Sequence, residues 1–404
     1  MRLAWGPSGP SDGPPGRPVA VTGIGVLAHA GIGVEAFWEG LSREPQVGNE
    51  RRVDGFDPSA YFGPKDVRHV DRFTQLAVAA AEEAFDGAGR PEVDPARAGI
   101  WVGTGVGGLE TLEQQVLLNA DRGSRRVSPY LVPMMMANAV PGTVSIRWGW
   151  RGPCETTVTA CAAGTQAIGN AARLVSSGRC VVALGGGAEA AITPTAKAGF
   201  ANMTALSQSG VSRPFDRDRD GFVMGEGAAM LVLEDLEHAR ARGARVLALL
   251  AGAASTADAH HITAPSPGGS GAVACMELAI ADAGLEPSEI THINAHGTST
   301  PLNDAAEAEA IGKLFGVPGP PVTSVKGVNG HALGAAGALE AVASVLTLAH
   351  GRIPPTGGLR NQDPEILLDV VQGAPRDWTP GPVLSNSFGF GGHNGCLVFL
   401  PAPA

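Results

Sequence analysis

Cysteine is scarce in this chain, and the few cysteines present exclude two ways of building a small stabilised protein. There are five in 404 residues, and no two of them form a CxxC pair. Their irregular spacing matches neither a disulfide framework nor a structural zinc site. A low, unpaired thiol content is typical of a reducing compartment, so we expect a cytoplasmic protein.

Positive charge is also in short supply. The chain has 29 lysines and arginines against 39 acids, a net charge of −10. Nucleic-acid binding requires a broad basic surface, so we expect no nucleic-acid partner. The N-terminal residues lack the apolar core of a secretory signal, and no apolar run reaches membrane-spanning length. We expect no membrane partner and interpret the Gly/Pro-rich residues 1–18 as a disordered tail.

Glycine and small apolar residues, in contrast, are abundant: there are 57 glycines, and 44% of the chain is hydrophobic. The length exceeds what a single hydrophobic core normally serves. Apolar runs predict strands, and 3.6-residue periodicity predicts helices between them. The strands are expected at 19–28, 97–105, 180–190, 245–256 and 291–296, and the helices at 73–89, 271–285 and 302–316. This alternation predicts an α/β protein of two similar halves, residues 19–245 and 246–404.

One cysteine stands in a setting that favours chemistry. Cys161 lies in "VTACAAG", before a predicted buried helix that ends near Gly178. At the first turn of a helix, free N–H groups and the helix dipole favour an anion, which would lower the pKa of a thiol. The alternative is that Cys161 is a small packing residue. The other four cysteines lack such a setting, and we interpret them as structural.

Two histidine motifs and a glycine-rich loop follow in the second half. His296 lies in "NAHGTSTPLND", and "SVKGVNGHALGAAG" contains Lys326 and His331. A single histidine is more often a structural residue than a catalyst, but both here are flanked by glycine at expected strand or loop ends. Near the C-terminus, "NSFGFGG" surrounds Phe390 with glycines that permit close backbone approach or loop motion.

In this order and at this spacing, the four motifs resemble the elongating β-ketoacyl-acyl-carrier-protein synthases of the thiolase superfamily, which include the ketosynthase subunits of type II polyketide synthases. The resemblance covers roughly residues 19–400. It implies a thiolase fold, with two similar βαβ-type halves in an α-β-α-β-α arrangement. It also implies decarboxylative Claisen condensation of a cysteine-bound acyl chain with malonyl-acyl carrier protein, in fatty-acid or type II polyketide synthesis.

The resemblance also implies roles for individual residues. Cys161 would carry the acyl chain, and its N–H and that of Phe390 would form the oxyanion hole. His296 and His331 would stabilise the enolate as neutral hydrogen-bond donors. Lys326 would support the electrostatics of the site, with Glu307 as its partner. Gating is assigned to Phe390, Gly389, Gly391 and the 258–263 loop, which begins at Asp258.

The resemblance implies that the enzyme needs no cofactor of its own, because the phosphopantetheine arm arrives on the acyl carrier protein. Thr298 and Thr300 match positions that hold this arm, although a turn or helix cap is an alternative role. Carrier docking is implied at Lys65, Arg68, Arg125 and Arg126, where ordinary solvated charge is the alternative. The acyl pocket is implied at Val106, Tyr130, Leu131 and Met135, where core packing is the alternative. The partner subunit would be an identical chain or a chain-length-factor-like subunit.

Glu340 raises a separate question, since it lies in an otherwise apolar helix where an unpaired acid is costly. The resemblance implies a monovalent-cation site there, formed by Asn294, Glu340, Ser385 and Asn386. A hydrogen-bonded structural acid is the alternative interpretation.

Other readings of the motifs fit less well. A degradative thiolase would carry a second catalytic cysteine in the C-terminal glycine loop, where this chain has Phe390. An initiating synthase would use Cys-His-Asn, and a non-catalytic chain-length subunit would lack the cysteine. A nicotinamide-binding oxidoreductase would rest on one glycine-rich turn, "VTGIGVLAHAG". "SVKGVNGH" and His393 depart from the commoner family pattern, which leaves the substrate class open.

Overall fold

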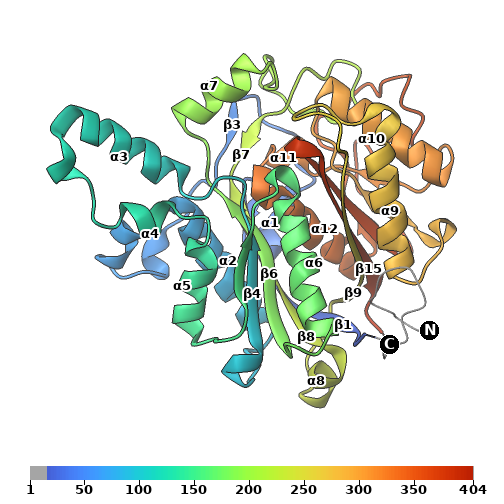
Figure 1. The fold of residues 1–404 in the computed structure, drawn as a ribbon. Helices are drawn as coiled ribbons and strands as arrows, with labels where there is room; N and C mark the ends of the chain where they lie inside the picture. The colour runs from blue at the N-terminus through green and yellow to red at the C-terminus, as the bar shows by residue number, and fades with distance from the viewer. Residues whose placement is uncertain (1–15, 404) are drawn as a thin grey trace.

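Two five-stranded arrays with the same strand order form the frame of the molecule, whose computed structural model describes residues 16–403 (Figure 1). The predicted tail lies almost entirely outside the described residues. The main strands are β1 (Val19–Ala28), β4 (Ala98–Gly103), β5 (Cys154–Thr157), β6 (Val182–Glu189), β8 (Gly227–Asp235), β9 (Ala248–Ala257), β10 (His292–Asn294), β11 (Val322–Thr323), β14 (Val383–Gly389) and β15 (His393–Pro401). Short strands are β2 (Gly31–Ile32), β3 (Glu50–Arg51), β7 (Met224–Gly225), β12 (Arg352–Ile353) and β13 (Arg376–Asp377).

The strand order shows an internal duplication. The first half runs β5-β4-β6-β8-β1, and the second runs β11-β10-β14-β15-β9. In each half the first three strands are parallel and the last two are antiparallel to their neighbours. A short pairing of β1 with β9 joins the two halves. Each helix and strand expected from the sequence is present, with ends shifted by a few residues.

The helices complete five layers. They are α1 (Val34–Gly40), α2 (Arg72–Gly87), α3 (Leu109–Arg122), α4 (Leu131–Met135), α5 (Ala139–Trp148), α6 (Ala163–Ser176), α7 (Pro194–Asn202), α8 (Leu236–Ala241), α9 (Ser270–Asp282), α10 (Pro301–Phe315), α11 (Lys326–Asn329) and α12 (Ala336–His350). α6 and α12 contact each other and strands of both halves, while α2 and α9 cover the outer faces (Figure 1). The predicted α-β-α-β-α thiolase fold is confirmed.

The central helix α12 carries the most apolar stretch of the molecule. By length and composition, Leu333–His350 could cross a membrane, so the expectation that no run reaches this length is wrong. However, 89% of this stretch is buried, since α12 lies between the two sheet halves. Its apolar composition is that of a core helix packed on both sides.

Candidate active site

The sequence around Cys161 forms a tight turn at the start of a central helix. Cys161 lies in a 3₁₀ turn, η5 (Ala160–Ala162), directly before α6, and its side chain is buried. Ala160, just before it, has a φ of +49°, a conformation that a residue with a side chain rarely adopts. Such strained turns cluster at functional sites. The fold therefore places the Cys161 thiol at the start of a helix, the position that the sequence predicted for a nucleophile.

The C-terminal glycine loop lies against this turn. A Cβ on Gly389 would be 3.0 Å from the backbone nitrogen of Cys161, tighter than most real Cβ contacts, so glycine favours this approach. Beyond it, the backbone N–H of Phe390 donates to the Cys161 side chain. Gly391 donates its N–H to Ile262 O (2.7 Å), which links the loop to the segment that begins at Asp258. Asp258 is itself held by the side-chain amide of Asn394 at 2.7 Å.

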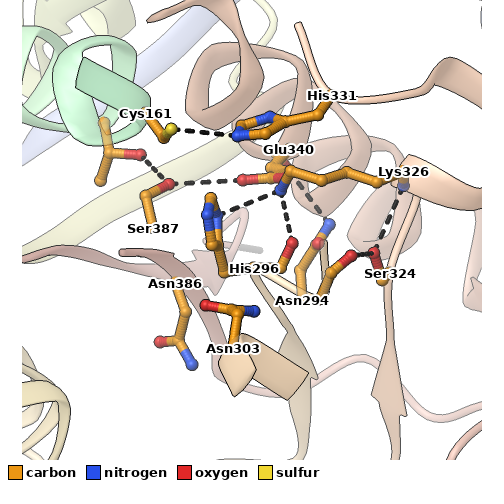
Figure 2. Close-up of polar contacts among 12 residues, drawn as sticks. Cys161, Asn294, His296, Asn303, Ser324, Lys326, His331, Glu340, Asn386 and Ser387 are labelled. Carbon is orange, nitrogen blue, oxygen red and sulfur yellow. Dashed lines mark hydrogen bonds and ion pairs between the residues drawn. The ribbon is translucent and has the colours of Figure 1, made fainter. Parts of the chain in front are cut away.

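Two histidines from the second half complete the cluster (Figure 2). Nε2 of His331 is 3.0 Å from Sγ of Cys161. The rings of His296 and His331 are nearly perpendicular, with centroids 5.4 Å apart. One ring nitrogen from each histidine and Sγ of Cys161 all lie within 4.8 Å of one another. The structure thus brings together three side chains that are up to 170 residues apart in the chain.

Lys326 lies behind the histidines, but its partner differs from the one expected. It donates to the backbone oxygen of His296 at 2.5 Å and lies 3.2 Å from Nδ1 of that ring. Its ion pair is with Glu340, so the assignment of Glu307 as partner is wrong. Glu307 instead accepts the N–H groups of His296 and Gly297 at 2.8 and 2.7 Å. The reason is topological: Glu340 lies on the central helix α12, whereas Glu307 lies on α10, which packs against the outer helix α9.

Burial controls the protonation of the site. It raises the pKa of the Cys161 thiol to about 11, an increase that nearby Lys326 only partly offsets. The expectation that the helix N-terminus would lower this pKa is therefore wrong. Burial, followed by the charge of Lys326, holds the pKa of His296 and of His331 well below the usual value. At neutral pH the cluster is a thiol beside two neutral imidazoles.

A cavity of about 580 Å³ opens onto this cluster. Its lining includes Thr298, Thr300, Asp258 and Phe390, all placed in or near the site by the sequence. The hydroxyls of the two threonines lie 2.9 Å apart, and that of Thr300 also caps α10 by accepting the N–H of Asn303. The two interpretations of these threonines, a cap and a cavity wall, are therefore compatible.

The implied acyl-pocket residues lie elsewhere. Val106, Tyr130, Leu131 and Met135 do not line the cavity at Cys161 within this chain, and their place in an acyl pocket shaped by a partner subunit remains a prediction. Tyr130, Leu131 and Met135 lie at α4, which with α3 forms a projection from the body (Figure 1). Val106 and Tyr130 are 50% and 42% exposed. Exposed apolar side chains crowd this projection because little of the same chain packs against it.

The four implied docking residues share an exposed position. They are Lys65, Arg68, Arg125 and Arg126. Within residues 16–403, none of the ion pairs includes any of them. His69, next to Arg68, stacks on Tyr130 with ring centroids 3.7 Å apart, so this segment lies against α4. Their docking role remains a prediction.

The four residues implied as cation ligands do not all face the same side of the sheet, because Ser385 and Asn386 are neighbours on β14 and point to opposite faces. Asn294 Oδ1 and Ser385 Oγ are buried and have no hydrogen-bond partner among the described residues; Asn294 donates to Glu340 O and pairs with Ser385 across the sheet. Glu340 is paired with Lys326 and accepts from Ser387 at 3.3 Å. The side chain of Asn386 points away, toward Met276 and Glu307, so it does not join the set (Figure 2). Three of the four side chains fit a cation, and the structural-acid reading of Glu340 also holds.

Two polar residues near the site, Ser387 and Glu189, were not predicted from the sequence. Ser387 bridges Glu340 and Thr165, at 3.3 and 2.7 Å. It lies in the quoted "NSFGFGG" motif, so the period-two alternation along β14 could have placed it on the same face as Ser385. Glu189 ends the apolar run of β6 and is fully buried. An acid at the end of an apolar strand was the available signal for it.

Two family models match this chain. Residues 44–239 match the family model "Beta-ketoacyl synthase, N-terminal domain", and residues 247–360 match "Beta-ketoacyl synthase, C-terminal domain". The chain is 45% identical to 3-oxoacyl-[acyl-carrier-protein] synthase 2 of Synechocystis sp., over 94% of this chain and 97% of the relative.

Solved structures are similar over nearly their whole length. The ishigamide ketosynthase/chain length factor gives a TM-score of 0.90 at 36% identity, over 96% of this chain and 100% of the other. A type II polyketide acyl-carrier protein in complex with its ketosynthase bound to the hexaketide (AntDE:AntF) gives 0.87 at 30% identity, with the same coverage.

Proposed function

Since the chain belongs to the β-ketoacyl synthase family of condensing acyltransferases, we propose that it joins an acyl chain carried on Cys161 to the malonyl group of malonyl-acyl carrier protein. The observation that carries this proposal is the buried cluster of Cys161, His296 and His331 at the end of a cavity. A thiol beside two neutral imidazoles suits acyl transfer followed by enolate formation.

The first step loads the enzyme. Sγ of Cys161 attacks the acyl thioester while its proton moves toward Nε2 of His331, 3.0 Å away. The bond to the carrier's pantetheine sulfur breaks, and that sulfur leaves with a proton. The tetrahedral oxyanion is met by the N–H of Cys161 and that of Phe390, which already points at the thiol. Transfer of the proton to a neighbouring base allows a thiol with a raised pKa to act as the nucleophile.

The second step forms the carbon–carbon bond. The malonyl C–C bond to the carboxylate breaks, carbon dioxide leaves, and the electron pair forms a thioester enolate. After loading, neutral His331 takes the tautomer that carries its proton on Nε2, opposite to the tautomer that accepts the thiol proton; it and neutral His296 then donate hydrogen bonds to the enolate oxygen. The enolate carbon attacks the acyl carbonyl on Cys161, and the cysteine sulfur leaves and recovers a proton. Lys326 orients His296 through its contacts with the ring and backbone oxygen of that residue.

No cofactor takes part in these steps, and the phosphopantetheine arm of the carrier would pass Thr298 and Thr300. Asn294, Glu340 and Ser385 offer oxygen ligands that fit a monovalent cation. Such an ion would neutralise negative charge behind the histidines.

We infer that the partner subunit covers the α3–α4 projection and the free edge of β5. Val116, Leu117 and Val132 are more than half exposed there. β5 ends the strand order, so one of its edges is unpaired within the described chain. A second copy would cover both and add the walls for Val106, Tyr130, Leu131 and Met135.

The 45% identity to a 3-oxoacyl-acyl-carrier-protein synthase 2 favours a self-sufficient cytoplasmic enzyme over a chain that works only with a chain-length subunit. The choice between fatty-acid and polyketide substrates remains open.

The decisive test follows the acyl group. After incubation with an acyl-carrier donor, peptide mapping by mass spectrometry is expected to find the acyl group on Cys161. The exposed Cys154 is the matched control, and Cys154→Ser should leave the labelling unchanged. Cys161→Gln should abolish condensation while malonyl-carrier is still decarboxylated, because both histidines remain. Stable acylation of another cysteine, with none on Cys161, would refute the proposal.

Carrier docking has its own test. Reversing Arg125 and Arg126 to glutamate is expected to raise KM for carrier-bound substrate and to flatten its dependence on ionic strength, because the carrier is acidic. Arg240→Glu, on α8 at the opposite end of the molecule in Figure 1, is the matched charge change. If the double variant and the parent respond identically to salt, the docking assignment is wrong.

A further inference from the structure

Glu189 is a buried acid close to the catalytic cluster that the steps above do not use. It is the last residue of β6 and is fully inaccessible to solvent. Among the described residues, no ion pair includes it. Its carboxylate instead accepts from the Thr104 hydroxyl at 3.0 Å and from the N–H groups of Gly105 and Gly334 at 2.6 and 3.0 Å. An acid held only by neutral donors in the core costs stability, so its retention requires a reason.

Two of its three backbone partners, Gly105 and Gly334, belong to different halves of the molecule, and the third, Val106, directly follows Gly105. Gly105 follows β4 in the first half. Gly334 lies in the 3₁₀ turn η8 (Leu333–Ala335) of the second half, three residues after His331. A Cβ on Gly334 would be 2.1 Å from the nitrogen of Gly105, so the two backbones touch. The Glu189 carboxylate therefore joins the two loops at their closest approach.

The position of His331 depends on such backbone anchors. Its Nδ1 atom is buried and has no hydrogen-bond partner in the part of the chain that the structure describes, so no described side chain holds that edge of the ring. At the histidine itself, the backbone N–H of His331 donates to Val223 O at 2.7 Å, and its carbonyl oxygen accepts the N–H of Gly225 at 2.9 Å. Downstream, the bond from Gly334 to Glu189 holds the turn. The 3.0 Å approach of Nε2 to Cys161 rests on these two fixed ends.

We propose that Glu189 is a positioning residue for His331, fixing the turn after the histidine to the loop after β4. The catalytic consequence rests on the proposed function, whereas the anchoring itself does not. Because one carboxylate oxygen receives both glycine N–H groups, the acceptor matters here and the charge does not. Glutamine can present an oxygen at the same place, whereas the shorter aspartate cannot reach it.

The test compares Glu189→Gln, Glu189→Asp and Glu189→Ala in the full-length enzyme. Alanine should lower kcat about 100-fold, as expected when a catalytic group shifts by about 1 Å. KM for malonyl-carrier should change little. Glutamine should restore most of kcat and should exceed aspartate, the reverse of the order that a role for the charge predicts. In hydrogen–deuterium exchange, a peptide covering residues 329–336 should exchange faster in the alanine and aspartate variants than in the glutamine variant.

Each outcome decides the matter. Parental kcat in a folded alanine variant, or aspartate exceeding glutamine, would overturn the role assigned to Glu189. If the alanine variant does not fold, the order of the other two variants still decides. If the parent itself does not condense acyl and malonyl groups, the proposed function fails, and the exchange comparison still tests the anchor.

Discussion

Replacing His331 by alanine is expected to remove both malonyl decarboxylation and condensation, with a loss of about two to four orders of magnitude in rate. The reason is its double position: Nε2 is 3.0 Å from the Cys161 thiol, and the ring stands beside His296 where the enolate oxygen would form. Carbon dioxide release from malonyl-carrier measures the first activity, and mass spectrometry of carrier-bound products measures the second. His296→Ala should lose both activities as well.

His292 is the matched control for this loss. It is also fully buried and lies in the same half, but among residues 16–403 neither of its ring nitrogens has a hydrogen-bond partner, and its ring stacks edge-on with Trp378. His292→Leu should therefore retain decarboxylation near the parental rate. If His331→Ala decarboxylates as fast as the parent while acylation of Cys161 stops, His331 serves the thiol only, and its enolate role is wrong.

The catalytic set could be predicted from the sequence because each member lies in a short, distinctive motif. Strand and helix periodicity placed Cys161 and His296 at the ends of predicted elements. The order and spacing of the motifs along the chain then carried the family resemblance. The alternation of strands and helices along the sequence predicted an α/β protein, whereas the layered α-β-α-β-α arrangement was implied by the family resemblance. The three side chains indeed meet within 4.8 Å.

The pairing of Lys326 could not be predicted this way. Glu307 and Glu340 both lie on helices that follow a motif residue, and sequence distance does not say which helix packs in the central layer. Only the three-dimensional arrangement puts α12, and so Glu340, beside Lys326. The prediction of a lowered pKa for the Cys161 thiol was wrong for a related reason. The sequence shows that Cys161 lies at a helix N-terminus, but it does not show the burial that raises the pKa more than the helix lowers it.

The acyl-pocket residues mark a different limit. Tyr130 and Met135 lie on a projection of one chain. If a partner subunit completes the acyl pocket, the structure of a single chain does not show which side chains line it. Glu189 was missed because most of its partners are backbone N–H groups, with the Thr104 hydroxyl as the only side-chain donor among the described residues. Backbone donors leave no residue-type signature, so a buried acid at a strand end shows its role only in the folded structure.

Lys326→Met is expected to be the most destabilising of the changes considered, by about 3–5 kcal/mol, because removing one member of a buried ion pair leaves the other charge uncompensated. Lys326 and Glu340 are 2% and 1% exposed. The matched control is Lys313→Met, which breaks an exposed Lys313–Glu309 pair and should cost less than about 0.5 kcal/mol. Denaturant unfolding of the parent and both variants measures the difference.

The pH dependence of this loss has a definite sign. Burial raises the pKa of Glu340 to about 7 even with Lys326 present, and removing the lysine raises it further. A carboxyl with a raised folded-state pKa binds more protons in the folded than in the unfolded chain between its two pKa values, so lowering the pH through that window favours the folded state. The deficit of Lys326→Met relative to the parent should therefore be larger at pH 8 than at pH 6. A deficit that is equal at both values, or that grows as the pH falls, would show that ionised Glu340 does not depend on Lys326.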